Sequence, residues 1–211
     1  MIKYFLFLLF PLFLSAQWVD DMNKAPVQPR TMLGGQASYF RISVHNFEDI
    51  YAGRWGESFG GFAGVRAFGA HYITLKYGTF SKGGKSGIHP PTGLRLENAR
   101  WNEHWYKIGL RIHPPIENKW GSYYGFGLGF YQVQEQEPLS IFQTMREQGS
   151  NTESGGTGFY LELGVDYMII NNVAAFFELE ISSGGTRGRS SFEAMSVGGW
   201  LLSLGLIVWP F

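Results

Sequence analysis

Residues 158–181 read GFYLELGVDYMIINNVAAFFELEI. On each side of the Asn-Asn pair at 171–172, one parity is large and apolar while the other is polar or small. A period of two is the pattern of a strand whose two faces meet different surroundings. Two such runs joined by Asn-Asn predict a β-hairpin with a tight turn, because Asn tolerates the backbone conformations that such turns require. The polar parity carries the four carboxylates Glu162, Asp166, Glu178 and Glu180.

The same alternation recurs in six further runs, which are 38–46, 57–68, 71–80, 104–112, 123–134 and 192–211. Each of the eight runs is close to the ~9–11 residues that a tilted strand needs to cross a bilayer. The links between them are short at 69–70 and 171–172, medium at 114–121, and long at 47–56, 81–98, 137–156 and 183–191. Short turns on one side and long loops on the other are typical of outer-membrane barrels. The sequence therefore predicts an all-β, eight-stranded antiparallel up-and-down transmembrane β-barrel with extracellular long loops.

Composition supports this fold and excludes several functions. The 211 residues include 17 basic and 17 acidic side chains, so net charge gives no indication of nucleic-acid binding. Charged residues make up 16% of the chain, below the ~25% of an average globular protein, whereas aromatics reach 17%. The absence of cysteine rules out disulfides and thiol chemistry. The histidines lack partners at metal-ligand spacing, so we expect no metal and no cofactor.

The N-terminus has the features of an export signal. Lys3 precedes an apolar run from Tyr4 to Leu14, and small residues follow up to a plausible cleavage point after Ala16. We predict a signal peptide at 1–16, a flexible periplasmic lead-in at 17–33 and the barrel at 34–211. After Ala16 no apolar run is long enough for a membrane helix.

Charged side chains are predicted to face the lumen. An eight-stranded barrel is just wide enough to be filled by side chains, and buried charges there must be paired. We therefore expect structural ion pairs, with a proton or ion path as the alternative interpretation. The residues concerned are Arg41, Arg66, Lys76, Lys107, Arg111, Glu162, Asp166, Glu178 and Glu180.

Aromatic residues gather near the predicted strand ends, where rings at headgroup level form the belts of membrane barrels. This set comprises Trp101, Trp105, Tyr106, Trp120, Tyr123, Tyr124, Trp200, Trp209 and Phe211. The glycines at 125, 127 and 129 lack the spacing of a phosphate-binding loop. They are better interpreted as space for bulky inward neighbours.

The signal peptide, the eight alternating segments and the terminal Phe211 resemble the OmpA-like family of small outer-membrane barrels over residues ~34–211. The resemblance implies a monomer in the bacterial outer membrane, in contact with its lipid or lipopolysaccharide. It also implies that the barrel-assembly machinery recognises the last strand through Gly205, Trp209 and Phe211. Pro210 and the spacing from Gly205 to the terminus depart from the family pattern.

Three functions are compatible with this sequence. The first is a non-enzymatic barrel of structural or interaction type, with a filled, ion-paired lumen and long extracellular loops. The second is a lipid A-modifying acyl hydrolase or transferase that uses His45, Ser191 and Glu193 at the outer rim. The third is a soluble, lipocalin-like barrel around an apolar ligand, which requires the apolar faces to point inward.

Overall fold

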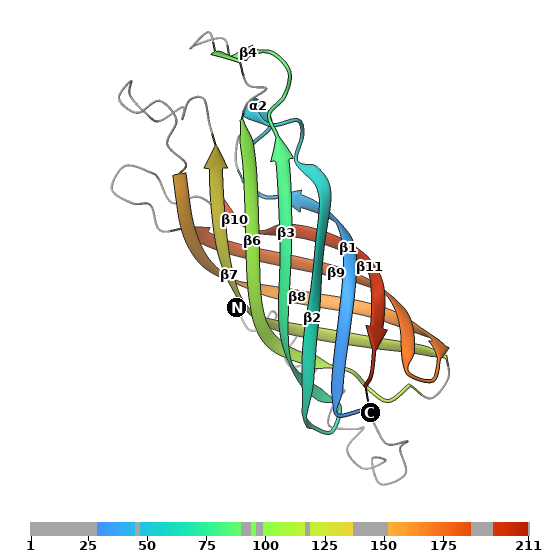
Figure 1. Ribbon diagram of the computed structural model, residues 1–211. Coiled ribbons are helices and arrows are strands. Elements are labelled where there is room, and N and C mark those ends of the chain that lie inside the picture. Colours follow the sequence, from blue (N-terminus) through green and yellow to red (C-terminus); the bar gives the residue numbers. More distant parts are fainter. Residues whose placement is uncertain are drawn as a thin grey trace, which may run out of the picture.

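The computed structural model describes residues 29–44, 47–89, 94–95, 99–116, 119–136, 152–186 and 196–210, and shows an antiparallel sheet that closes on itself (Figure 1). The predicted signal peptide and residues 17–28 of the lead-in lie outside this description. So do His45, Ser191, Glu193 and Phe211. Among the described residues, no helix is long and apolar enough to cross a membrane.

Eight long strands form the wall, and each pairs antiparallel with the next. The last strand pairs with the first from Leu33↔Val208 to Ile42↔Gly199, which closes the barrel. The strands are β1 (Thr31–Ile42), β2 (Trp55–Phe68), β3 (His71–Gly83), β6 (Arg100–Ile112), β7 (Trp120–Gln136), β8 (Thr152–Ile170), β9 (Val173–Thr186) and β11 (Gly199–Val208).

Four short elements lie at one end of the wall. The helix α2 (Phe47–Ile50) follows β1, and the strands β4 (Ile88–His89) and β5 (Leu94–Arg95) pair with each other between β3 and β6. The strand β10 (Ser196–Val197) pairs with β9 just before β11 begins. Gly198 joins β10 to β11 with a φ of 89°, a backbone conformation that glycine adopts without strain.

The links alternate in length as the sequence predicts. Tight turns at 69–70 and 171–172 join β2 to β3 and β8 to β9 at the end where β1 starts and β11 finishes. The strands β1, β3, β7 and β9 finish at the opposite end of the wall, where the longer links of the sequence begin. The wall begins at Thr31, three residues before the predicted start at 34, because Thr31 already pairs with Val65 of β2.

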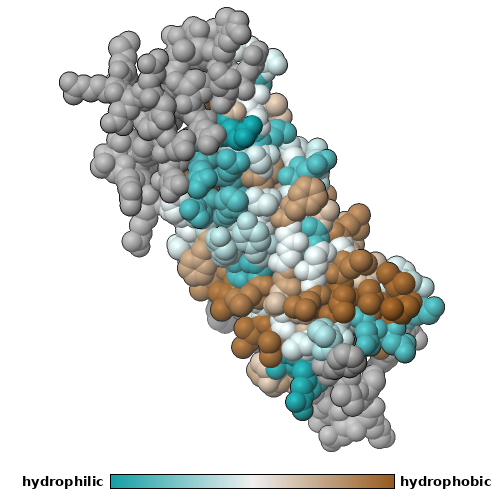
Figure 2. Space-filling view, in the orientation of Figure 1, coloured by the Kyte–Doolittle hydropathy of each residue, from teal (hydrophilic) through white to brown (hydrophobic). Residues whose placement is uncertain are grey.

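The outer face of the wall is apolar. On β8, Leu161 and Leu163 are 52% and 62% exposed, whereas the alternating residues Tyr160 and Glu162 are buried. Figure 2 shows brown, hydrophobic side chains in a band across the lower part of the wall, with paler and teal side chains toward the long-link end. This band is the surface that hydrocarbon covers, so the soluble barrel with apolar residues pointing inward is wrong.

The wall is taller than a bilayer requires. β7 and β8 contain 17 and 19 residues, whereas about 9–11 residues span the hydrocarbon. Strands therefore continue beyond the apolar band toward the long-link end. In that upper part the outside meets headgroups and water, and the inside holds one of the two buried hydrophobic clusters of the barrel.

This change of environment corrects the predicted orientation of β1. Phe40 and Ile42 are 1% and 0% exposed and point inward, so Arg41 lies on the outer face and not in the lumen. The prediction assigned large apolar residues to the outside, which holds only where the outside is hydrocarbon. Near its long-link end, β1 instead turns its large apolar side chains into the barrel.

Candidate functional site: the lumen

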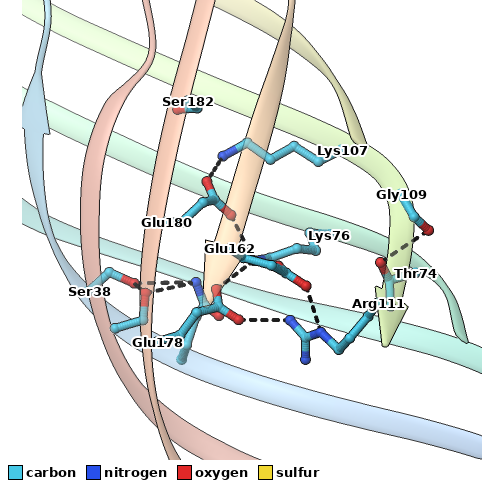
Figure 3. A network of polar contacts seen from close by, with 12 residues as sticks. Ser38, Thr74, Lys76, Lys107, Gly109, Arg111, Glu162, Glu178, Glu180 and Ser182 are labelled. Carbon is cyan, nitrogen blue, oxygen red and sulfur yellow. Dashed lines mark hydrogen bonds and ion pairs between the residues drawn. The ribbon is translucent and has the colours of Figure 1, made fainter. Parts of the chain in front are cut away.

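A layer of buried charges crosses the middle of the lumen (Figure 3). At its centre is Lys76 of β3, whose Nζ lies 2.7 Å from Glu162 Oε2, 2.6 Å from Glu178 Oε1 and 2.7 Å from Glu180 Oε2. An ammonium has three N–H donors and each of them meets a different carboxylate. The side chains of all four residues are at most 3% exposed. We call these four residues, together with Lys107 and Arg111, the ionic layer.

Two further cations of β6 complete the ionic layer. Arg111 donates from Nε to Glu162 Oε1 and from Nη2 to Glu178 Oε2, both at 2.7 Å. Lys107 donates to Glu180, and its Nζ lies 5.0 Å from the centre of the Trp105 ring. The layer thus balances three cations against three carboxylates. Such balance is what permits burial, since removing one partner leaves another charge unpaired in a low dielectric.

Strand alternation turns all six of these groups into the lumen, and strand register brings them within reach of one another. Glu178 and Glu180 are two residues apart on β9, and Glu180 is the cross-strand partner of Glu162 on β8. Lys76 and Lys107 are cross-strand partners on β3 and β6. The acids and bases therefore enter from opposite sides of the barrel, and they meet across the lumen because the barrel is closed and narrow.

The three carboxylates have the spacing of a cation site. Glu162, Glu178 and Glu180 each offer an oxygen within 4.8 Å of the others. The position that a metal ion would take is filled by the Lys76 ammonium, which already satisfies these oxygens. The arrangement is therefore a self-neutralised cluster.

Above the ionic layer, toward the long-link end, rings close the lumen. Phe47 and Tyr51 of the α2 segment are each 2% exposed and stack with ring centroids 4.4 Å apart. Both meet the ring of Trp101 edge to face. Tyr51 Oη also donates to Glu135 Oε1 at 2.5 Å. We call this group the aromatic cap, and it joins a buried cluster that includes Phe40, Ile42, Phe80, Trp105, Tyr131 and Leu201.

Backbone hydrogen bonds hold the α2 segment in the mouth. The amide of Ala52 donates to Gly83 O, and that of Lys85 donates to Ile50 O. These bonds tie the link after β1 to the link after β3. The cap is therefore a part of the loop structure that packs down into the barrel.

Below the ionic layer, at the short-turn end, a second cluster fills the lumen. It consists of Met32, Phe62, Tyr72, Tyr123, Ala174, Phe176, Ile207 and Trp209. A buried pair lies within it, where His113 Nε2 is 2.8 Å from Asp166 Oδ2. The His113 ring stacks on Tyr123, whose hydroxyl donates to Glu178 at 3.0 Å. The lower cluster is thereby linked to the ionic layer.

Glycines on β7 make room for these side chains. A Cβ at Gly125 would lie 2.5 Å from Glu162 Oε1, and one at Gly127 would fall against the Tyr160 ring. Gly205 on β11 similarly faces the ring of Phe176. The interpretation of these glycines as space for inward neighbours is confirmed, and Gly205 has this packing role independently of any part in assembly.

The structure brings together six of the nine predicted lumen charges, which are the members of the ionic layer. Asp166 pairs instead with His113, and Arg66 lies half-buried at the short-turn end of β2. Arg41 faces outward. The residues of the enzyme hypothesis, His45, Ser191 and Glu193, lie outside the described residues.

The predicted aromatic belts are wrong in part. Tyr106, Trp120 and Trp200 are exposed on the outer wall. In contrast, Trp101, Trp105, Tyr123 and Trp209 are at most 5% exposed and pack inside the lumen. Proximity to a strand end indicates height in the barrel, but it does not distinguish the outside of the wall from the inside.

Two buried titratable residues were missed. Glu103 and His113 have 0% and 5% exposure, and both share the parity of Lys107 and Arg111 on the same segment. Extending the β6 alternation by a few residues in each direction would have found them.

No protein-family model and no curated protein matches this sequence. Solved structures match its fold. Neisserial surface protein A gives a TM-score of 0.57 at 14% identity over 85% of this chain and 97% of that chain. OprG from Pseudomonas aeruginosa gives 0.51 at 14% identity over 84% and 93%. Ail from Yersinia pestis, in complex with the heparin analogue sucrose octasulfate, gives 0.50 at 12% identity over 86% and 99%.

At these identities the similarity concerns the fold, and the apolar outer wall supplies the second argument. A closed sheet has no free edge, and an apolar exterior around a charged interior is stable only in a membrane. The chain is therefore a small eight-stranded β-barrel of the bacterial outer membrane.

Proposed function

We propose that this protein is a non-enzymatic, non-conducting outer-membrane barrel whose filled lumen acts as a rigid scaffold for its long loops. The observation that carries the proposal is the stacking of three layers across the lumen: the aromatic cap, the ionic layer and the lower cluster. Lys76, at the centre, contacts three carboxylates, and its side chain is only 3% exposed.

The ion pairs suit a scaffold better than a channel. Pore-lining charges in a conducting barrel face water, whereas the side chains of the ionic layer are buried and hydrogen-bonded to one another. The aromatic cap further ties the loop after β1 to the barrel interior through Phe47 and Tyr51. Rigid support of loops is a common way for a barrel to present contacts.

Conductance measurements test the first part of the proposal. The refolded protein, verified by its mobility shift between unheated and heated gel samples, is added to planar bilayers in concentrated potassium chloride. We expect no stepwise conductance. Regular, reproducible steps from protein that passes the gel test would contradict a filled lumen.

Loop shortening tests the scaffold. A variant with a shorter link at 137–151 should keep the urea unfolding midpoint of the parent, because the layers that hold the barrel lie inside it. A loss of folding in this variant, with normal insertion of the parent, would show that the loop supports the barrel and not the reverse.

Mass analysis of lipid A separates the scaffold from the lipid-modifying alternative. We expect the same lipid A acylation in cells with and without the gene.

A further inference from the structure

Arg41 is the last outward residue of β1 and lies at the long-link end of the wall. Its cross-strand partners are Trp200 on β11 and Trp55 on β2, so an exposed indole stands on each side of it. Phe40 and Ile42, its neighbours in sequence, point into the lumen, and the guanidinium therefore lies on the other side of the wall from the ionic layer. Among the residues that the structure describes, no carboxylate forms an ion pair with Arg41.

From Arg41 toward the short-turn end, the outer wall becomes apolar. The next outward residue of β1 is Tyr39, whose cross-strand partner on β2 is the exposed Glu57. On β11, every second residue from Leu202 to Leu206 is an exposed leucine. Arg41 is therefore placed where the apolar band ends, a position at which tryptophans and basic side chains of membrane proteins meet lipid headgroups. We call Arg41, Trp55, Trp200, Tyr39 and Glu57 the outer patch.

A depression of about 540 Å³ opens in the outer wall beside Trp55. The ring of Tyr39 stacks on that of Trp55, with centroids 5.2 Å apart and planes 11° from parallel. The lining of the depression combines rings with polar side chains and includes Tyr39, Trp55, Phe59, Glu57, Thr79 and Ser81. Rings that pack against a ligand and a few polar groups that orient it are the usual composition of a small-molecule pocket. Next to an unpaired guanidinium, this composition fits a phosphorylated sugar.

We propose that the outer patch binds lipid A, the membrane anchor of lipopolysaccharide. The long links mark the extracellular end of the barrel, where lipopolysaccharide forms the outer leaflet. A phosphate of lipid A accepts hydrogen bonds from the Arg41 guanidinium, a pairing that suits the planar fork of arginine. The sugar lies against the stacked rings of Tyr39 and Trp55, its hydroxyl and amide groups donate to Glu57, and the acyl chains cover the leucines of β11. The site is on the outer wall, so it goes beyond the proposed scaffold and does not depend on the filled lumen.

Native mass spectrometry of the delipidated, refolded barrel tests the proposal. Bisphosphorylated lipid A, the same lipid A without its phosphates, and phosphatidylglycerol are added separately. A chelator removes divalent cations, so that Glu57 cannot hold a phosphate through a bridging ion. We expect one bisphosphorylated lipid A to be retained in preference to the other two lipids. The proposal is overturned if either of the others is retained equally well, or if protein that shows the gel-mobility shift retains no lipid.

Substitution of Arg41 tests the phosphate contact. Arg41→Gln should weaken retention of bisphosphorylated lipid A by about threefold to fivefold, as expected for one exposed ion pair, and should leave the dephosphorylated lipid unaffected. Arg41→Lys keeps the charge and should recover most of the loss. The matched control is Arg100→Gln, because Arg100 is also outward and exposed at the long-link end, but its cross-strand partners Gly83 and Gln136 carry no ring. This control should bind as the parent does, and equal losses in Arg41→Gln and Arg100→Gln would overturn the site.

Discussion

The ionic layer and the aromatic cap fill the same lumen by different physics. In the ionic layer Lys76 and Arg111 meet carboxylates from strands that are not their neighbours, so every contact depends on closure of the whole barrel. In the cap, Phe47 and Tyr51 come from a loop segment that packs down from outside. The stability of the ionic layer depends on charge balance, whereas that of the aromatic cap depends on how completely its rings fill the space. Damage to the first should therefore weaken the entire barrel, whereas damage to the second should stay local.

Lys76→Met should produce the largest loss. It keeps most of the side-chain volume but leaves Glu162, Glu178 and Glu180 around an apolar group with one negative charge in excess. Removing one member of a buried ion cluster costs about 3–5 kcal/mol. Urea unfolding of the barrel in lipid vesicles should show this as a lower midpoint.

Lys82→Met is the matched control for that variant. Lys82 lies on the same strand, but its Nζ donates to a backbone carbonyl at the rim and its side chain is not enclosed by carboxylates. A change at such a position usually remains within about 0.5 kcal/mol. Equal losses in the two variants would mean that charge balance in the lumen is not what stabilises the barrel.

Phe47→Ala should give the next largest effect, confined to the cap. The ring is 2% exposed and contacts Tyr51 and Trp101. Emptying such a position costs about 3 kcal/mol, which here weakens the docking of α2 and not the pairing of the strands. Hydrogen exchange of residues 47–52 should accelerate while the urea midpoint changes little. A midpoint as low as that of Lys76→Met would remove the distinction between the two regions.

Arg111→Lys tests geometry within the ionic layer while preserving charge. The guanidinium binds Glu162 through Nε and Glu178 through Nη2, and it packs against the rings of Phe62 and Tyr123. A lysine ammonium lacks the planar fork that reaches both acids, so we expect a loss of about 2 kcal/mol. Unfolding at the parent midpoint would show that net charge alone is sufficient.

The difference between the two regions also explains what the sequence could and could not predict. The alternation in 158–181 predicts the hairpin and its inward carboxylates, because hydrocarbon and lumen impose opposite polarity on the two faces of a strand. The same rule fails for Arg41, because its neighbours Phe40 and Ile42 point into an interior that is apolar and ring-filled at that height. Strand alternation indicates which residues share a face, but only the surroundings determine which face is inside.

The pairing of charges could be predicted only in outline. That Lys76 and Glu178 face the lumen follows from parity, but their contact depends on barrel register and on the three strands that separate β3 from β9. The α2 segment could not be predicted, because Phe47 belongs to a link without periodicity and its burial depends on Trp101, more than fifty residues later. Long-range packing of this kind leaves no local pattern.

Tyr51→Phe should have the smallest effect, and it separates the polar from the apolar contribution to the cap. The substitution keeps the ring that stacks on Phe47 but removes the hydroxyl that donates to Glu135 Oε1. A hydrogen bond to a charged acceptor contributes about 1.5 kcal/mol, so docking of α2 should weaken by roughly that amount. Exchange of the Ala52 and Lys85 amides, which bond the α2 segment to the link after β3, should rise several-fold but less than in Phe47→Ala. Tyr39→Phe, on the outer wall, is the control and should leave both amides unchanged. If Tyr51→Phe also leaves the two amides unchanged, ring packing alone holds the cap in place. The cap would then owe nothing to polar contacts, in contrast to the ionic layer.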